Sequence, residues 1–187
     1  HGFEKVEGSD ELKITNVEGN VVRTINDLPA AAVYREQLEK LNLLKKGESL
    51  IQSAANYPMG IKILWGEHLK IRTPMNVGET EVSFAGSIPK GSRVSVVYSN
   101  PDKMIDAARN MMKDTVGILK GRQPSAQIVI DCAGRWKTLA QRYSEQVEAF
   151  KSESKCPMIG FASYGEIAKY SGSLEGFHNT TSVTAIW

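Results

Sequence analysis

Two short apolar runs on either side of a helical stretch constrain the fold of this chain most. Residues 126–130 and 158–162 each have the length and the apolar character of a buried strand. Between them, apolar residues recur at the spacing of one helical face: Trp136, Leu139, Ala140, Tyr143, Val147 and Phe150. A strand, a helix and a second strand of this length form most simply a right-handed crossover, in which the two strands are parallel.

The first part of the chain predicts a hairpin followed by a helix. Residues 12–25 alternate between polar and apolar side chains around the turn sequence Glu18-Gly19-Asn20. After them, Asp27 is placed to cap a helix that has Pro29 in its first turn. Gly47 is the residue at which we expect this helix to end.

The middle of the chain favours antiparallel strands and a second helix. Between residues 57 and 98, short strand-like runs are separated by turn residues, at 60–65, 69–72, 81–84 and 93–98. Asn100-Pro101-Asp102 then has the order of a helix start, and a methionine-rich stripe after it is expected to pack in the core before the helix stops at Gly121. The sequence therefore predicts an α+β fold. We expect a mixed, largely antiparallel sheet, flanking helices and one β-α-β crossover unit near the C-terminus.

Composition narrows the class of protein. The chain has 187 residues, of which 41% are hydrophobic, so it can bury a core as one domain or a domain with an appendage. Its formal net charge is +2 and its basic residues are scattered, which disfavours nucleic acid as a partner. No apolar run approaches the roughly 20 residues of a membrane span. These observations are typical of a soluble globular protein.

The positions of the cysteines and histidines indicate the redox compartment and whether a metal site is expected. Cys132 and Cys156 each lie beside a predicted strand, and we expect two free thiols and a reducing, cytoplasmic compartment. The three histidines stand far apart, at positions 1, 68 and 178, which disfavours a metal site. A phosphate-binding loop is not found either, so we expect no cofactor.

Five polar residues that are far apart in the sequence are expected to meet at one edge of the crossover unit. Cys132 and Arg135 leave the carboxyl end of its first strand, and Glu166 follows the second. His178 and Asn179 come just before the last predicted strand. If that strand runs antiparallel to its predecessor, it starts at the edge where the parallel strands end. Strand directions alone therefore predict the convergence.

The residues leave two chemical interpretations of this group open. A cysteine at a helix N-terminus near an arginine has a stabilised thiolate, so Cys132 and His178 would suit a cysteine-dependent hydrolase. Alternatively, Arg135 binds a ligand carboxylate and Glu166 an ammonium, with His178 and Asn179 completing the hydrogen bonds. Each residue also has a structural interpretation: a packed thiol, an ion pair between Arg135 and Glu166, and a loop cap.

At these residues the chain resembles the FIST family, sensory modules named for F-box and intracellular signal-transduction proteins. The matching motifs are Cys132-Ala133-Gly134-Arg135, Tyr164-Gly165-Glu166-Ile167 and Phe177-His178-Asn179-Thr180-Thr181. The combination of Gly-Glu-Ile with His-Asn-x-Thr is the specific part of this likeness. The opening of the chain, from His1-Gly2 to Leu28-Pro29-Ala30, resembles the junction between the two halves of the family's module.

The resemblance implies a domain division and a function. Residues 1–50 would be a junction hairpin and helix from the N-terminal half, and residues 51–187 the FIST C-terminal domain. It implies an intracellular sensor of small ligands such as amino acids, and not an enzyme, with Cys132, Arg135, Glu166, His178 and Asn179 as ligand-binding residues. The missing N-terminal half or a signalling output domain would be its protein partner. A scaffold that binds only proteins is a further alternative, and it would present a large exposed apolar patch.

Overall fold

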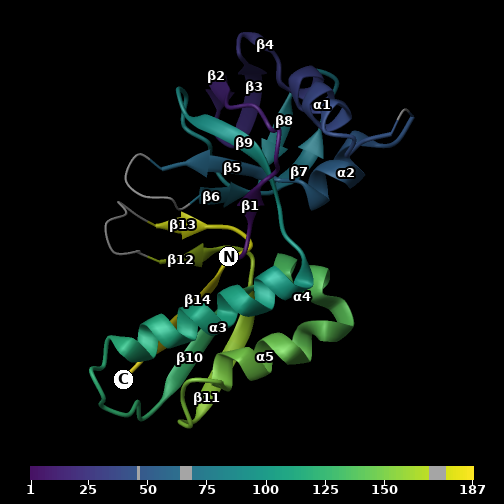
Figure 1. Ribbon diagram of the computed structural model, residues 1–187. Helices are drawn as coiled ribbons and strands as arrows, with labels where there is room; N and C mark the ends of the chain where they lie inside the picture. The colour runs from purple at the N-terminus through teal and green to yellow at the C-terminus, as the bar shows by residue number, and fades with distance from the viewer. Residues whose placement is uncertain (46, 64–68, 169–175) are drawn as a thin grey trace. The chain divides into compact units, whose positions relative to one another are not determined.

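The protein folds into two compact units. The computed structural model describes residues 1–45, 47–63, 69–168 and 176–187 (Figure 1). The N-terminal unit comprises Glu4–Tyr98, and the C-terminal unit consists of His1–Phe3 together with the described chain from Ser99 onward. Helices and mostly antiparallel strands make up the two units, which confirms the predicted α+β class. These two units differ from the predicted boundary at residue 50 between the two halves of the family's module, and that boundary stays a prediction.

The N-terminal unit is an antiparallel sheet with two helices. Its strands lie in the order β6-β5-β9-β2-β3-β8-β7, with β1 beside β9 and β4 beside β3. The strands are β1 Glu4–Lys5, β2 Leu12–Glu18, β3 Val21–Ile25, β4 Leu28–Pro29, β5 Met59–Lys62, β6 Leu69–Arg72, β7 Pro74–Val77, β8 Val82–Phe84 and β9 Arg93–Tyr98. The helices are α1 Ala30–Lys40 and α2 Leu50–Asn56. Alternate strand residues and one face of α1 form its core, including Ile14, Ile25, Tyr34 and Leu38.

The predicted hairpin is confirmed as β2 and β3, but the helix after it differs from the prediction. Asn26 and Asp27 have positive φ angles of 51° and 63°, which these two residue types tolerate in turns. Asp27 is therefore a turn residue and not a helix cap, and α1 begins at Ala30, directly after Pro29. The helix ends at Lys40 and does not continue to Gly47.

The antiparallel strands expected between residues 57 and 98 are confirmed. Of the strand predicted at 60–65, residues 64 and 65 lie outside the described residues. Sequence analysis did not predict α2, β7 or the two-residue strands β1, β4, β12 and β13. The α2 segment is only seven residues long, and so short a stretch shows little helical periodicity.

The C-terminal unit contains the predicted crossover. Strand β10 Gln127–Cys132 runs parallel to β11 Met158–Ser163, and antiparallel to β14 Ser182–Ile186 on its other side. A small two-stranded sheet, β12 Glu166–Ile167 with β13 Phe177–His178, precedes β14. In Figure 1, α3 Pro101–Gly117 and α5 Tyr143–Lys151 lie on one side of the three-stranded sheet. Their shared core includes Met104, Met112, Val129 and Phe150.

The connection between β10 and β11 is not one continuous helix as predicted. It consists of α4 Ala133–Leu139, a 3-10 turn Ala140–Arg142 and α5. The break falls at Ala140, whose φ of 46° lies in the left-handed region. Because the helix is interrupted there, the expected apolar stripe is split, and Trp136 is 59% exposed and not packed in the core.

Helix α3 begins as its sequence predicts. The side chain of Asn100 accepts a hydrogen bond from the backbone nitrogen of Lys103 at 2.9 Å, and Pro101 occupies the first turn. Met104 and Ala108 of the methionine-rich stripe are buried in the core as expected, whereas Met111 is only partly buried and the neighbouring Met112 takes the core position. The helix ends at Gly117 and not at Gly121.

We expect Asn100→Ala to lower the free energy of unfolding of the C-terminal unit by about 1 kcal/mol, because one backbone donor of α3 loses its acceptor. Asn100→Asp keeps a side-chain oxygen at the cap and should preserve stability. Urea denaturation followed by circular dichroism measures both changes. Equal losses for the two variants would contradict the capping role.

Candidate functional site

The residues predicted to converge do meet at one edge of the C-terminal sheet. Cys132 at the end of β10 is opposite Ser163 at the end of β11. Glu166 in β12 is opposite His178 in β13. The backbone nitrogen of Cys132 donates to the carbonyl oxygen of Thr181 at 3.1 Å, which brings the start of β14 to the same edge. The strand directions therefore produced the expected grouping.

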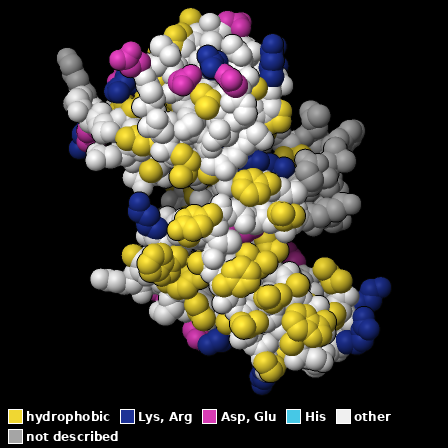
Figure 2. All heavy atoms as spheres, turned by 180° about the vertical axis from the view of Figure 1, so that it is seen from behind, with side chains coloured by type: hydrophobic (Ala, Val, Ile, Leu, Met, Phe, Trp, Pro, Cys, Tyr) yellow, Lys and Arg dark blue, Asp and Glu magenta, His cyan; other side chains and the backbone are white. Residues whose placement is uncertain are grey.

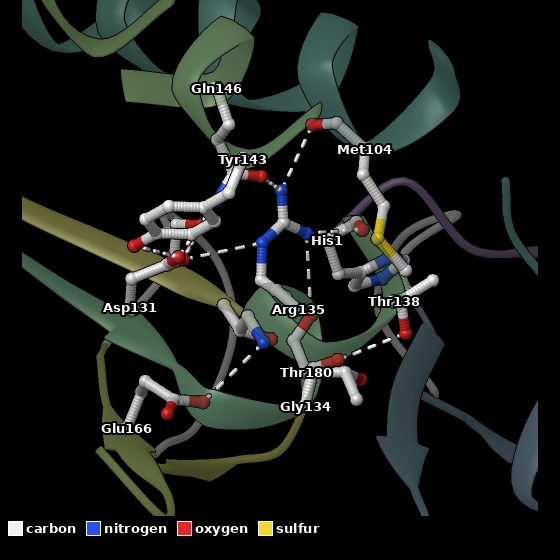
Figure 3. Close-up of polar contacts among 12 residues, drawn as sticks. His1, Met104, Asp131, Gly134, Arg135, Thr138, Tyr143, Gln146, Glu166 and Thr180 are labelled. Carbon is white, nitrogen blue, oxygen red and sulfur yellow. Dashed lines mark hydrogen bonds and ion pairs between the residues drawn. The ribbon is translucent and has the colours of Figure 1, made fainter. Parts of the chain in front are cut away.

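Arg135, in the first turn of α4, is the most enclosed of these residues and is only 1% exposed. Its Nε lies 3.3 Å from Oδ1 of Asp131. This ion pair joins the end of β10 to the first turn of α4. Figure 3 shows the guanidinium surrounded by acceptors from several segments. Its Nη atoms donate to the carbonyl oxygens of His1 at 2.8 Å, Met104 at 2.9 Å and Thr180 at 3.4 Å, and to Oε1 of Gln146. The structural interpretation offered an ion pair with Glu166 as one alternative, and the structure pairs Arg135 with Asp131 instead.

Asp131 is the centre of a second set of hydrogen bonds. Its Oδ2 accepts from the hydroxyl of Tyr143 at 2.9 Å and from Nε2 of Gln146 at 2.7 Å. Its Oδ1 accepts from the hydroxyl of Ser182 at 2.5 Å. Burial raises the pKa of this carboxyl group, while Arg135 and the donors act in the opposite direction. Sequence analysis did not assign these partners, because Asp131 lies in the strand and its partners come from the helices and from β14.

Glu166 is a second buried carboxylate, and it lies in β12, just after the end of β11. Its Oε1 accepts from the hydroxyl of Ser163 at 2.6 Å, and its Oε2 from the backbone nitrogen of Thr181 at 3.4 Å. A third hydrogen bond comes from the thiol of Cys132. Burial nevertheless raises the pKa of Glu166, because these donors offset the loss of solvent only in part. An added cationic donor would stabilise its ionised form.

The surroundings of Cys132 oppose thiolate formation. Burial is the largest influence and raises the pKa of the thiol, and the neighbouring Glu166 raises it further. Backbone hydrogen bonds from Gly134 and Thr180 act in the opposite direction. A nucleophilic cysteine needs a lowered pKa, so this environment disfavours the hydrolase interpretation.

Asn179 provides a buried acceptor. The residue is 2% exposed, and its side-chain Oδ1 has no hydrogen-bond partner among the described residues. Its main-chain carbonyl accepts from the hydroxyls of Thr180 at 2.6 Å and Thr181 at 3.0 Å. Thr180 itself has a φ of 53°, which is unusual for a β-branched residue. The neighbouring His178 is buried, with Nε2 3.2 Å from the carbonyl oxygen of Ala168.

Comparison with known families identifies the chain. The family model of the FIST C domain matches residues 30–169. The chain belongs to the FIST C domain family. The matched range includes Cys132, Arg135 and Glu166, whereas His178 and Asn179 lie beyond it. Comparisons with curated proteins and with solved structures found no match.

FIST domains are sensory domains that occur commonly in signal-transduction proteins, so the sensory character expected from the motifs is confirmed. In the described parts of the chain, no helix combines the length and the apolar character that a membrane crossing requires. Both cysteines are free, as predicted.

We expect Arg135→Met to lower the free energy of unfolding of the C-terminal unit by about 3–5 kcal/mol, because Asp131 would be left buried without its cation. Arg142→Met is the matched control, since Arg142 forms ion pairs with Asp102 and Glu145 at the surface. It should change the stability far less, because exposed ion pairs are screened by solvent. Urea denaturation provides the comparison, and similar losses for both variants would show that burial of Arg135 is not decisive.

Cys132 should react slowly with iodoacetamide at neutral pH, because its thiol is buried and its pKa is raised. Cys156 is half-buried and serves as the internal comparison within the same sample. Peptide mass spectrometry over a time course distinguishes the two sites. Faster labelling of Cys132 than of Cys156 at pH 7 would restore the hydrolase interpretation.

Proposed function

We propose that this FIST C domain is a cytoplasmic sensor of a small ligand with a cationic amine, such as an amino acid. The buried, unpartnered Oδ1 of Asn179 is the observation that carries this proposal, together with the hydrogen bond that ties the same segment, at Thr181, to the buried carboxylate of Glu166. A buried polar atom without a partner costs free energy, so its retention favours a role in binding. Free thiols support a reducing compartment.

The chemistry of the acceptors favours an ammonium group. Glu166 and Asn179 offer carboxylate and carbonyl oxygens, and an ammonium group supplies three donors and no acceptor. The Thr181 amide that donates to Glu166 is only two residues from Asn179, so one small cationic group can reach both residues. A cation at this position would also offset the desolvation that raises the pKa of Glu166.

The remaining predicted residues have supporting roles in this proposal. Arg135 binds the carbonyl oxygen of Thr180 and so positions the 179–181 segment. At 3.4 Å this is the longest hydrogen bond that Arg135 forms with the described residues, and it is the one that a ligand carboxylate would replace. Cys132 and His178 enclose Glu166 on the edge of the sheet. As protein partners we expect the N-terminal half of the module and an output domain.

Isothermal titration calorimetry with the standard amino acids tests the proposal. We expect at least one of them to bind, and Asn179→Ala or Glu166→Gln to weaken binding about tenfold or more, because each variant loses an acceptor. Asn110→Ala, an exposed amide on α3, is the matched control and should bind as the wild type does. Circular dichroism checks that all variants are folded.

The same titration should show proton release. Binding of an ammonium group favours the ionised form of Glu166, whose pKa is raised in the empty site. The affinity should therefore increase as the pH rises through that pKa, and repeating the titration in buffers of different ionisation enthalpy measures the proton released. Absence of binding across the panel, or binding that Asn179→Ala and Glu166→Gln leave unchanged, would refute the proposed function.

A further inference from the structure

The three-stranded sheet of the C-terminal unit has one covered face and one exposed face. On β10, Gln127, Val129 and Asp131 point to the covered face and are buried, with Val129 in the core beneath α3 and α5. The alternate positions and their cross-strand neighbours form the opposite face, which we call the open face. It consists of Ile128, Ile130, Ile159, Phe161, Val183, Ala185 and Trp187.

The open face is apolar up to the pair Cys132 and Ser163 at its ligand-site end, although solvent reaches it. Ile159 is 68% exposed, Phe161 55% and Trp187 63%. Figure 2 shows hydrophobic side chains gathered over the lower part of the molecule, where the sheet is seen from behind. A sheet face that stays in water normally carries polar side chains, and parallel strands are normally covered on both faces. An exposed apolar patch of this kind marks a binding surface.

The dimensions of the open face match those of one short α-helix. Three strands about 4.8 Å apart, paired over about five residues of 3.4 Å each, give a flat area of roughly 240 Å². An α-helix with its side chains is about 10 Å wide, and about 11 residues extend over 17 Å.

Charges at one end of the open face indicate the orientation of such a helix. Exposed basic residues lie in the segments that lead into β10 and β11, namely Lys120, Arg122 and Lys155, against one exposed acid there, Glu153. Ser125 donates to the carbonyl oxygen of Trp187, so the segment containing Arg122 adjoins the end of the open face. A helix with acidic residues in its first turn would complement this end, since carboxylates are also favoured at a helix N-terminus.

We propose that the open face binds an amphipathic α-helix of a partner protein. The helix lies along the strands, with its apolar side on Ile128, Ile130 and Phe161 and its acidic first turn beside Arg122 and Lys155. The observations behind this interaction are separate from those behind the ligand site. It uses the exposed side of the sheet, whereas the ligand site lies at the carboxyl ends of β10 and β11.

Fluorescence anisotropy with a labelled synthetic peptide tests the proposal. The probe is an amphipathic helix of about 14 residues with leucines at helical spacing and glutamates in its first turn. We expect saturable binding to the wild-type chain, and Phe161→Asp should weaken it about tenfold or more, because an unpaired charge would be buried under the helix. Leu28→Asp is the matched control, because Leu28 is also 55% exposed but belongs to the N-terminal unit. A second variant, Ile159→Lys, keeps the test valid if Phe161→Asp fails to fold.

Two further comparisons decide between occupants. A scrambled peptide of the same composition should bind about tenfold more weakly, and a peptide with lysines in its first turn should also lose affinity. The proposal is overturned if the probe does not bind, or if Phe161→Asp and Ile159→Lys leave its binding unchanged. If the wild type sediments as a dimer and the Phe161→Asp variant as a monomer, the open face binds a second copy of the chain. Binding to anionic phospholipid vesicles that Phe161→Asp abolishes, without peptide binding, would assign it to a membrane surface.

Discussion

The C-terminal unit depends on a cation that is buried among main-chain oxygens. The guanidinium of Arg135 joins segments that are distant in the sequence, because its acceptors lie at His1, in α3, in α5 and at Thr180. Burial alone would make such a charge very costly, and it is tolerated because Asp131 supplies the counter-charge and the carbonyls supply acceptors. Arginine suits this role better than lysine, since its planar group presents donors in several fixed directions.

The same cation also holds the main chain next to the proposed ligand site. By binding the carbonyl oxygen of Thr180, Arg135 contacts the turn that precedes β14. That turn contains the positive φ of Thr180, and its next residue donates a backbone hydrogen bond to Glu166. The main chain there is therefore constrained from both sides. Burying the Oδ1 of Asn179 without a partner among the described residues costs free energy. The hydrogen bonds that fix this backbone offset that cost.

The sequence predicted the layout of the site better than its contacts. The crossover and the meeting of Cys132, Glu166 and His178 at one edge follow from strand directions, and apolar runs and connection lengths are enough to infer those. The partner of Arg135 depends on side-chain positions within a few ångströms, and two acids, Asp131 and Glu166, lie near it. The alternative that paired Arg135 with Glu166 chose the wrong acid, because Asp131 lies in the strand and Arg135 in the following helix, and sequence spacing does not reveal a contact across that turn. Trp136 was misplaced for a different reason, since a left-handed residue such as Ala140 leaves no clear signal in apolar periodicity.

The polarity of the sheet links the two proposals. Gln127 and Asp131 occupy the covered face of β10, where helices supply hydrogen-bond partners, whereas Ile128 and Ile130 occupy the exposed one. Ser163, which donates to Glu166, lies two residues beyond Phe161 on the same strand, β11. A ligand that changes the ionisation of Glu166 therefore acts on the strand that carries the centre of the open face. Such coupling requires a difference in ligand affinity between the helix-bound and helix-free forms, and by linkage the helix must then alter ligand affinity by the same factor.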